Sequence, residues 1–200
     1  MRLYLSSYRL GDDECAVLEL VPAGSRVVIS GNALDGEAAV VRDKIVSMER
    51  DLFESLGYVT EELDLRAHFG RATLRSTLTR CGMLWTTGGN TFVLNTAIHL
   101  SGCDVALRAL LAEDAVAYGG YSAGAIVAGP SLHGVEHADP VDAFPADYPS
   151  RVPRWNGMGL VDFVVAPHAG DPQTDAMVRT LERRGIPCRA LRDGEVIVVR

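Results

Sequence analysis

The sequence has a single lysine, no cluster of basic residues and no long apolar run. Lys44 is that lysine, and 26 acidic residues against 19 basic ones give a net charge of -7. This balance disfavours nucleic acid as a partner, because phosphate contacts need a basic face. No segment is long and apolar enough to cross a membrane, and the apolar run after Met1 is too short for a signal peptide. We expect a cytoplasmic protein with no nucleic-acid or membrane partner.

Cysteines are few, and none of them form a C-x-x-C pair. The four stand far apart, at positions 15, 81, 103 and 188. Zinc sites and disulfide frameworks need closer spacing, so we expect reduced, mostly buried thiols. With 200 residues and 48% hydrophobic content, the chain can bury one sizeable core. We therefore predict a single domain over residues 1–200.

Short β-branched runs alternate with segments of helical periodicity along the chain. The predicted strands cover residues 26–30, 58–65, 82–86, 114–118, 160–166, 188–191 and 196–199, the last two joined by a turn at Asp193-Gly194. The predicted helices cover residues 37–56 and 72–79, both sides of Ser101-Gly102, and a segment from Asp171-Pro172 to Gly185. Repeated units of this kind predict an α/β fold of three layers, α/β/α, with a mostly parallel central sheet.

The longest predicted helix has a clear apolar stripe. Its members recur every three or four residues, which predicts that they form the buried face: Val41, Ile45, Met48, Leu52 and Leu56. Arg42 and Glu49 lie off that stripe, on the face that we expect to be solvated.

A G-x-S-x-G sequence centred on Ser122 follows the apolar run at 114–118 directly. This arrangement is typical of a nucleophile elbow, in which a strand reverses sharply into a helix and lifts the serine hydroxyl clear of the sheet. The N-terminus of that helix favours a developing oxyanion. The sequence thus predicts Ser122 as a nucleophile.

Two further predicted strands end in distinctive residues, Gly88-Gly89-Asn90 and Pro167-His168. Ligands bind beyond the carboxyl ends of parallel strands, so we expect these ends to converge on Ser122. The Gly-Gly-Asn segment fits a turn with a helix cap equally well. In the functional interpretation the Gly89 N–H is the second oxyanion donor, after that of Ala123.

His168 is the preferred general base among the five histidines. It alone follows a strongly apolar strand at the expected edge. His99 fits a packed position in a helix, and His68 lies in a polar connection. The other two histidines lie in the proline- and aspartate-rich segment 132–154, which has the composition of a mobile loop.

The orienting acid depends on chain order. In the order serine, acid, histidine the candidates are Glu136, Asp139, Asp142, Asp147 and Asp162. In the order serine, histidine, acid they are Asp171, Asp175, Asp193 and Glu195. Asp193 is preferred, because Asp171 fits a helix N-cap and Glu195 the start of a strand. Asp193-Gly194 also fits a plain hairpin turn.

Taken in order and at these separations, the three strand-end motifs resemble those of the peptidase E family of serine peptidases, the aspartyl dipeptidases. The resemblance implies a fold similar to class I glutamine amidotransferases, a flavodoxin-like architecture. It implies Ser122 as nucleophile, His168 as base, an oxyanion hole formed by Gly89 and Ala123, and a dipeptide with N-terminal aspartate as substrate. The acid is the least certain member, with Asp193 preferred to Glu195. The family also suggests a homodimer.

An acidic substrate side chain needs a cation, preferably arginine. Arg151 and Arg154 are the candidates, with Asn90 as a further substrate contact, although solvated loop arginines explain the first two equally well. A glutamine amidotransferase is disfavoured, since it would have cysteine at the elbow and a glutamate two residues after the histidine. The alternatives that stay open are a hydrolase of other acidic peptides and a catalytically silent binding or regulatory protein. The predicted reaction needs neither a metal nor a cofactor.

Overall fold

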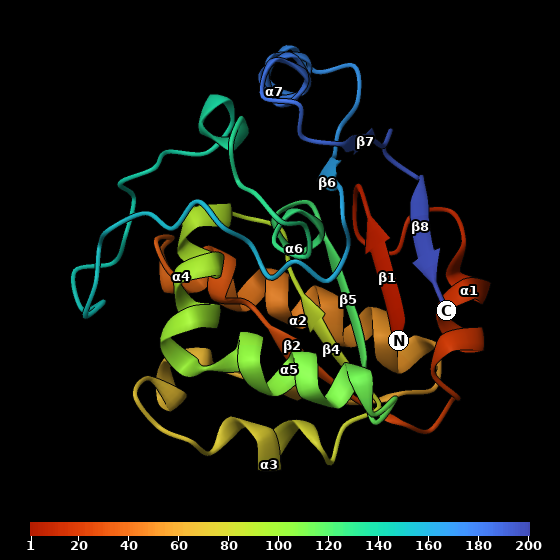
Figure 1. Cartoon of the computed structure of the whole chain (residues 1–200). Helices are drawn as coiled ribbons and strands as arrows, with labels where there is room; N and C mark the ends of the chain where they lie inside the picture. The colour runs from red at the N-terminus through yellow and green to blue at the C-terminus, as the bar shows by residue number, and fades with distance from the viewer.

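The computed structural model describes all 200 residues, with a mixed sheet at the centre (Figure 1). Six strands lie in the order β3-β2-β4-β5-β1-β8. Their bounds are β1 Arg2–Ser6, β2 Arg26–Ser30, β3 Val59–Glu62, β4 Met83–Thr86, β5 Ala117–Tyr121 and β8 Val196–Val199. All neighbours are parallel except β8, which runs antiparallel to β1. A separate parallel pair is formed by β6 Val164–Ala166 and β7 Cys188–Ala190.

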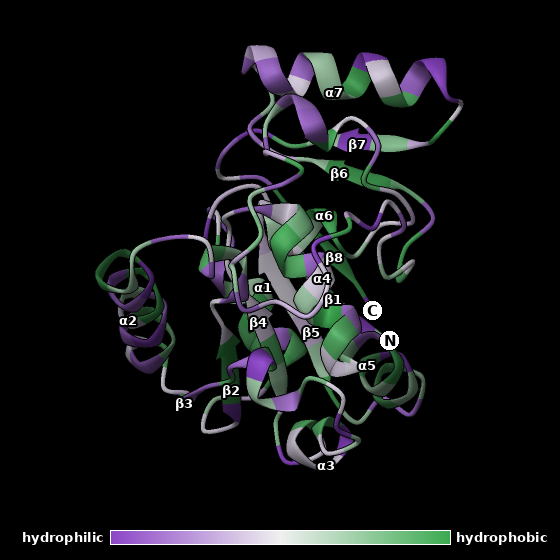
Figure 2. Ribbon diagram, turned by 90° about the vertical axis from the view of Figure 1, so that its left-hand side faces the viewer, coloured by the Kyte–Doolittle hydropathy of each residue, from purple (hydrophilic) through white to green (hydrophobic).

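Helices cover both faces of the central sheet. They are α1 Glu14–Leu20, α2 Ala39–Ser55, α3 Leu74–Leu78, α4 Thr91–Ser101, α5 Cys103–Ala112 and α6 Ala123–Ile126. A further helix, α7 Pro172–Arg183, packs against β6 and β7. Alternate strand residues enter two different cores: Leu3 and Leu5 pack on the side of α4 and α5, whereas Tyr4 packs on the side of α1 and α2. This arrangement confirms the predicted three-layer α/β/α fold. The β6–β7 pair and α7 lie beyond the carboxyl ends of the parallel strands (Figures 1 and 2).

The N-terminal part of the chain contains a strand and a helix, β1 and α1, that the sequence patterns do not predict. β1 nevertheless lies inside the sheet, between β5 and β8. One prediction at the other end is wrong: the strand over residues 160–166 is shorter and leaves the central sheet as β6. The turn predicted at Asp193-Gly194 is present, but the strands before and after it do not pair with each other. β7 pairs with β6, and β8 pairs with β1.

Helix α2 buries a face that overlaps only in part with the predicted one, since Leu52 and Leu56 of the predicted stripe are partly buried against the core. Val41 and Met48 are exposed, and the buried residues are Arg42, Val46, Glu49 and Phe53. The apolar stripe is misleading because both buried charges have partners from other elements. Arg42 pairs with residues 35 and 62, and Glu49 pairs with Arg9. The ribbon of α2 carries both hydrophilic and hydrophobic residues (Figure 2), and Val40 is also exposed.

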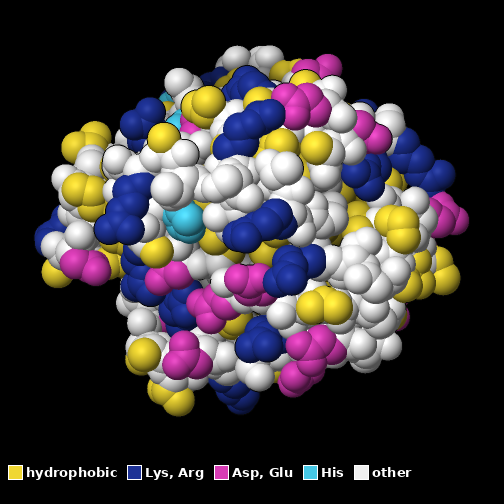
Figure 3. Space-filling view, turned by 90° about the horizontal axis from the view of Figure 1, so that it is seen from below, with side chains coloured by type: hydrophobic (Ala, Val, Ile, Leu, Met, Phe, Trp, Pro, Cys, Tyr) yellow, Lys and Arg dark blue, Asp and Glu magenta, His cyan; other side chains and the backbone are white.

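The surface carries charges of both signs. On the face seen from below, basic and acidic side chains are interspersed (Figure 3). No helix combines the length and apolar character that crossing a membrane requires. The four cysteines are free thiols, of which Cys81 and Cys103 are buried and Cys15 is exposed.

Candidate active site

Ser122 stands on a sharp turn between β5 and α6. Its backbone angles, φ 49° and ψ -113°, lie in a region that side-chain-bearing residues rarely adopt. The turn requires both glycines of the G-x-S-x-G sequence. A Cβ on Gly120 would lie 2.9 Å from the carbonyl carbon of Gly124, and one on Gly124 would lie 2.5 Å from the Thr86 carbonyl oxygen. Close backbone packing therefore produces the elbow that the sequence predicts.

His168 lies directly within reach of that serine. It follows β6 and Pro167, with a positive φ of 57°. Its Nε2 atom is 3.2 Å from Ser122 Oγ, and its Nδ1 atom is 2.7 Å from Asp193 Oδ1. The imidazole is partly exposed. The structure thus brings together the three residues predicted as nucleophile, base and acid, in the chain order serine, histidine, acid.

Asp193 lies in the loop between β7 and β8 and is the most exposed member of the three, with 60% of its side chain accessible. Burial alone would raise its pKa. Hydrogen bonds from Ser7 and His168 outweigh that effect and hold the pKa of Asp193 below its usual value. The carboxylate is therefore ionised at neutral pH and suited to accept the Nδ1 proton of His168.

Two of the other acids considered in the sequence bond to backbone groups away from His168. Glu195 accepts the Arg192 N–H within its own turn, at 2.7 Å. Asp139 accepts the Thr91 N–H at 2.8 Å, and burial raises its pKa. The remaining histidines bond or stack elsewhere, on Thr73, Asp104, Trp155 and Thr180.

Two backbone N–H groups next to the elbow have no acceptor within the protein. Ala123 is the first residue of α6, so no preceding helical carbonyl accepts from it. Gly89 likewise donates to no protein oxygen. Its φ of 137° favours glycine, and a Cβ there would lie 2.6 Å from the Ala33 carbonyl oxygen. Both groups are available to stabilise an oxyanion.

None of the predicted substrate contacts bonds to Ser122 or His168. The Asn90 amide caps α4 through Val93 N–H and donates to the Pro140 carbonyl, so both its ends have structural partners. Arg151 bonds to the carbonyl oxygen of residue 146. Arg154 is exposed, and its side chain makes no hydrogen bond or ion pair.

A cavity of about 360 Å³ lies beside Gly89. Its lining includes the carboxyl groups of Glu37 and Asp139 and contains neither arginine nor lysine. A larger groove of about 590 Å³ lies between α3, α4 and α5 and contains none of the candidate site residues. The smaller cavity therefore adjoins the candidate site at Gly89.

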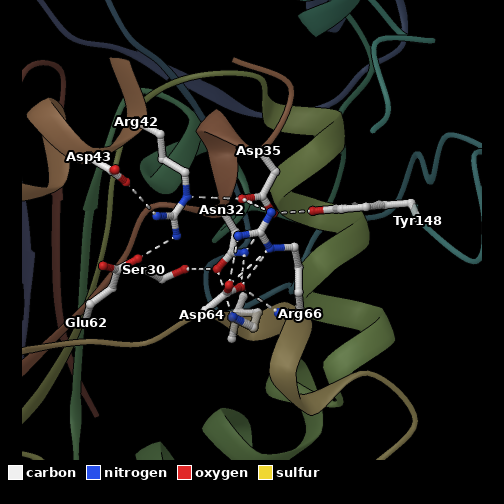
Figure 4. Close-up of polar contacts among 10 residues, drawn as sticks. Ser30, Asn32, Asp35, Arg42, Asp43, Glu62, Asp64, Arg66 and Tyr148 are labelled. Atoms are coloured by element: carbon white, nitrogen blue, oxygen red, sulfur yellow. Dashed lines mark hydrogen bonds and ion pairs between the residues drawn. The ribbon is translucent and has the colours of Figure 1, made fainter. Parts of the chain in front are cut away.

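A buried polar network supports the Gly89 side of the site (Figure 4). The side chain of Asp35 is fully buried and pairs with Arg42 and Arg66, and it accepts the Tyr148 hydroxyl proton at 2.7 Å. Asp64 bonds to Arg66 and to Asn32. Although burial opposes the effect, these hydrogen bonds lower the pKa of Asp64 to about 2.

This network fixes the segment around Ala33, against which Gly89 packs. Tyr148, together with Asn90 and Asp139, also ties the proline-rich segment 132–154 to the body of the protein.

The fold and this arrangement of residues resemble those of serine hydrolases that have a nucleophile elbow. Residues 37–200 match the model of peptidase family S51, and the chain belongs to that family.

Curated relatives carry peptidase names. The chain is 27% identical over 168 residues to the "Probable alpha-aspartyl dipeptidase" of Drosophila melanogaster, covering 79% of this chain and 64% of that one. It is 29% identical over 124 residues to the "Uncharacterized peptidase Lmo0363" of Listeria monocytogenes, and the match covers 62% of this chain and 57% of that one. The chain spans between 54% and 64% of the length of the curated relatives it matches.

Solved structures share the fold. A "Putative Peptidase E Protein" from Listeria monocytogenes EGD-e superposes with a TM-score of 0.75 at 23% identity, covering 100% of this chain and 98% of that one. A peptidase from an acI-B1 Actinobacterium superposes with a TM-score of 0.71 at 16% identity, covering 100% and 83%.

Proposed function

We propose that this chain is a cytoplasmic serine peptidase that hydrolyses small peptides through an acyl-enzyme. One observation carries the proposal: hydrogen bonds run from Asp193 through His168 to Ser122, and Ser122 stands on a strained elbow. Membership of peptidase family S51 supports the same reaction class. In this proposal Asp193 orients the imidazole and stabilises its protonated form.

In the first half-reaction, Ser122 Oγ attacks the scissile carbonyl carbon while His168 Nε2 takes the hydroxyl proton. The N–H groups of Gly89 and Ala123 stabilise the oxyanion of the tetrahedral intermediate. His168 then gives its proton to the leaving amine, the C–N bond breaks, and an ester joins Ser122 to the acyl part. Water attacks that ester as His168 takes its proton. The acid product leaves and the proton returns to Ser122.

The substrates that we propose are dipeptides with an N-terminal aspartate, by analogy with the relative named as an alpha-aspartyl dipeptidase. The cavity beside Gly89 suits a free amino terminus, because the Glu37 and Asp139 carboxyl groups offer a counter-charge for an α-ammonium group. Arg151 or Arg154 would bind the substrate carboxylate.

A turnover screen over dipeptides with Asp, Glu, Asn or Ala in first position tests the proposal. We expect Asp first to be hydrolysed fastest, and acetylation of the amino terminus to remove turnover. Ser122→Ala should keep the fold and lose activity. If Arg151→Ala or Arg154→Ala raises KM for the Asp peptide alone, that arginine is identified.

The screen also separates the remaining interpretations. Equal rates for all four peptides would reject aspartyl specificity while retaining the peptidase. Absence of turnover, together with no labelling of Ser122 by a serine-reactive phosphonate, would reject the peptidase and favour a binding protein on the same scaffold.

A further inference from the structure

Ser7 is a buried residue at the carboxyl end of β1 that takes no part in the mechanism above. Its accessible surface is 0%, and it lies at the same edge of the sheet as Ser122. No sequence motif surrounds it. In the structure, however, its hydroxyl lies between two members of the candidate triad.

The Ser7 hydroxyl makes two hydrogen bonds, each of 2.8 Å. It donates its proton to Asp193 Oδ1, and it accepts the backbone N–H of His168. A hydroxyl has one proton and two lone pairs, so both bonds can form at once. The oxygen Oδ1 of Asp193 is also the one that accepts from His168 Nδ1. Ser7, Asp193 and His168 therefore form a closed ring of three hydrogen bonds.

Each bond constrains a group that is otherwise held weakly. His168 has a positive φ, which is unfavourable for a residue with a side chain, so its backbone needs external support. Asp193 is mostly exposed, and an exposed carboxylate has rotamers that point away from the histidine. The Ser7 hydroxyl restrains both groups in the geometry that aligns the imidazole with Ser122.

The backbone next to Ser7 restrains the same loop. The Ser7 N–H donates to the Glu195 carbonyl at 3.2 Å, and the Asp12 N–H donates to the Gly194 carbonyl at 2.8 Å. The segment after β1 therefore holds the two residues that follow Asp193.

We infer that Ser7 is a positioning residue of the triad, one that fixes the Asp193 carboxylate and the His168 backbone through a single hydroxyl. The inference rests on the proposed function for its catalytic consequence. The hydrogen-bond geometry itself can be measured without any substrate.

The test compares Ser7→Ala with Ser101→Ala. Ser101 is another buried serine, and its hydroxyl bonds only to the Ile98 carbonyl within α4. For both variants, proton NMR of the protein without ligand records the downfield Nδ1–H resonance of His168, and peptide turnover gives kcat and KM. Thermal unfolding confirms that each variant is folded.

We expect Ser7→Ala to shift or broaden the His168 resonance and to lower kcat about 10- to 100-fold with little change in KM, because the imidazole loses its alignment. Ser101→Ala should leave the resonance and kcat unchanged. Ser7→Thr, which keeps the hydroxyl, should retain the resonance. If Ser7→Ala does not fold, Ser7→Cys, with its weak S–H donor, replaces it and should shift the resonance in the same way.

An unchanged resonance and unchanged kcat in the folded variant would overturn the inference. If the wild-type protein has no turnover on any peptide, the proposed function fails, but the resonance of Ser7→Ala still decides the role of Ser7.

Discussion

Arg9→Met is the substitution whose effect follows most directly from the buried charges. Glu49 of α2 is 1% exposed, and its carboxylate has two partners. Arg9 Nε lies 2.9 Å from one oxygen, and Trp85 Nε1 donates to the other at 3.0 Å. Burial raises the pKa of Glu49, and the Arg9 charge opposes that rise. Methionine keeps much of the side-chain packing and removes the charge.

Breaking a buried ion pair by removing one partner costs about 3–5 kcal/mol, because the other charge is left uncompensated. Arg9 is 27% exposed, so solvent screens part of the attraction, and we expect a loss of about 2–3 kcal/mol in the free energy of unfolding at neutral pH. The pKa of Glu49 should rise further in the variant. A raised carboxyl pKa means that the folded state binds more protons than the unfolded state, so the loss should grow as pH rises through that pKa.

Urea unfolding of wild type and Arg9→Met at pH 5 and pH 8 measures this effect. Adding Glu49→Gln to Arg9→Met should recover most of the stability at pH 8, because the neutral amide oxygen still accepts from Trp85. A loss below about 0.5 kcal/mol, or one that is equal at both pH values, would refute the assignment of a buried, uncompensated charge.

Three further predictions concern the site and its support. Gly89→Ala should displace an oxyanion donor and lower kcat about 100-fold or more in a peptide turnover assay. The control is Gly70→Ala, at another positive-φ glycine that has open space around it, and this variant should not lower kcat. Asp193→Asn should lower turnover strongly through the wrong imidazole tautomer; a large effect of Glu195→Gln instead would reassign the acid. The pKa of Asp64 is lowered to about 2, so its contribution to the free energy of unfolding should persist above about pH 4 and be lost as pH falls towards 2. In urea unfolding, Asp64→Asn should therefore reduce the loss of stability between pH 4 and pH 2. An unchanged loss in the variant would exclude Asp64 as its source.

Local sequence patterns predict the features of the site that depend on neighbouring residues in the chain. The elbow at Ser122 follows from close-packed glycines, and the strand-end position of His168 follows from the run of apolar residues before it. Asp193 was favoured by elimination, and the structure places its carboxylate on the imidazole. These roles stay predictions until turnover is measured.

Features set by distant partners could not be read from the sequence. The buried face of α2 contains Arg42 and Glu49, and both are stable there only because their counter-charges arrive from other elements. Ser7 has no motif, since its partners follow it by more than 160 residues. Strand β1 was missed because its five residues become a strand only by pairing with β5 and β8.

The place of β1 between β5 and β8 has a consequence for the order in which the protein matures. Residues 1–124 contain β1, β5 and the elbow, so a growing chain can form the nucleophile early. The antiparallel partner of β1 comes much later in the chain: Leu3 pairs with Val199. Contacts over such separations form slowly, and synthesis proceeds from the N-terminus. A chain in which β8 has not yet docked would thus present Ser122 before the Asp193 loop is fixed beside His168.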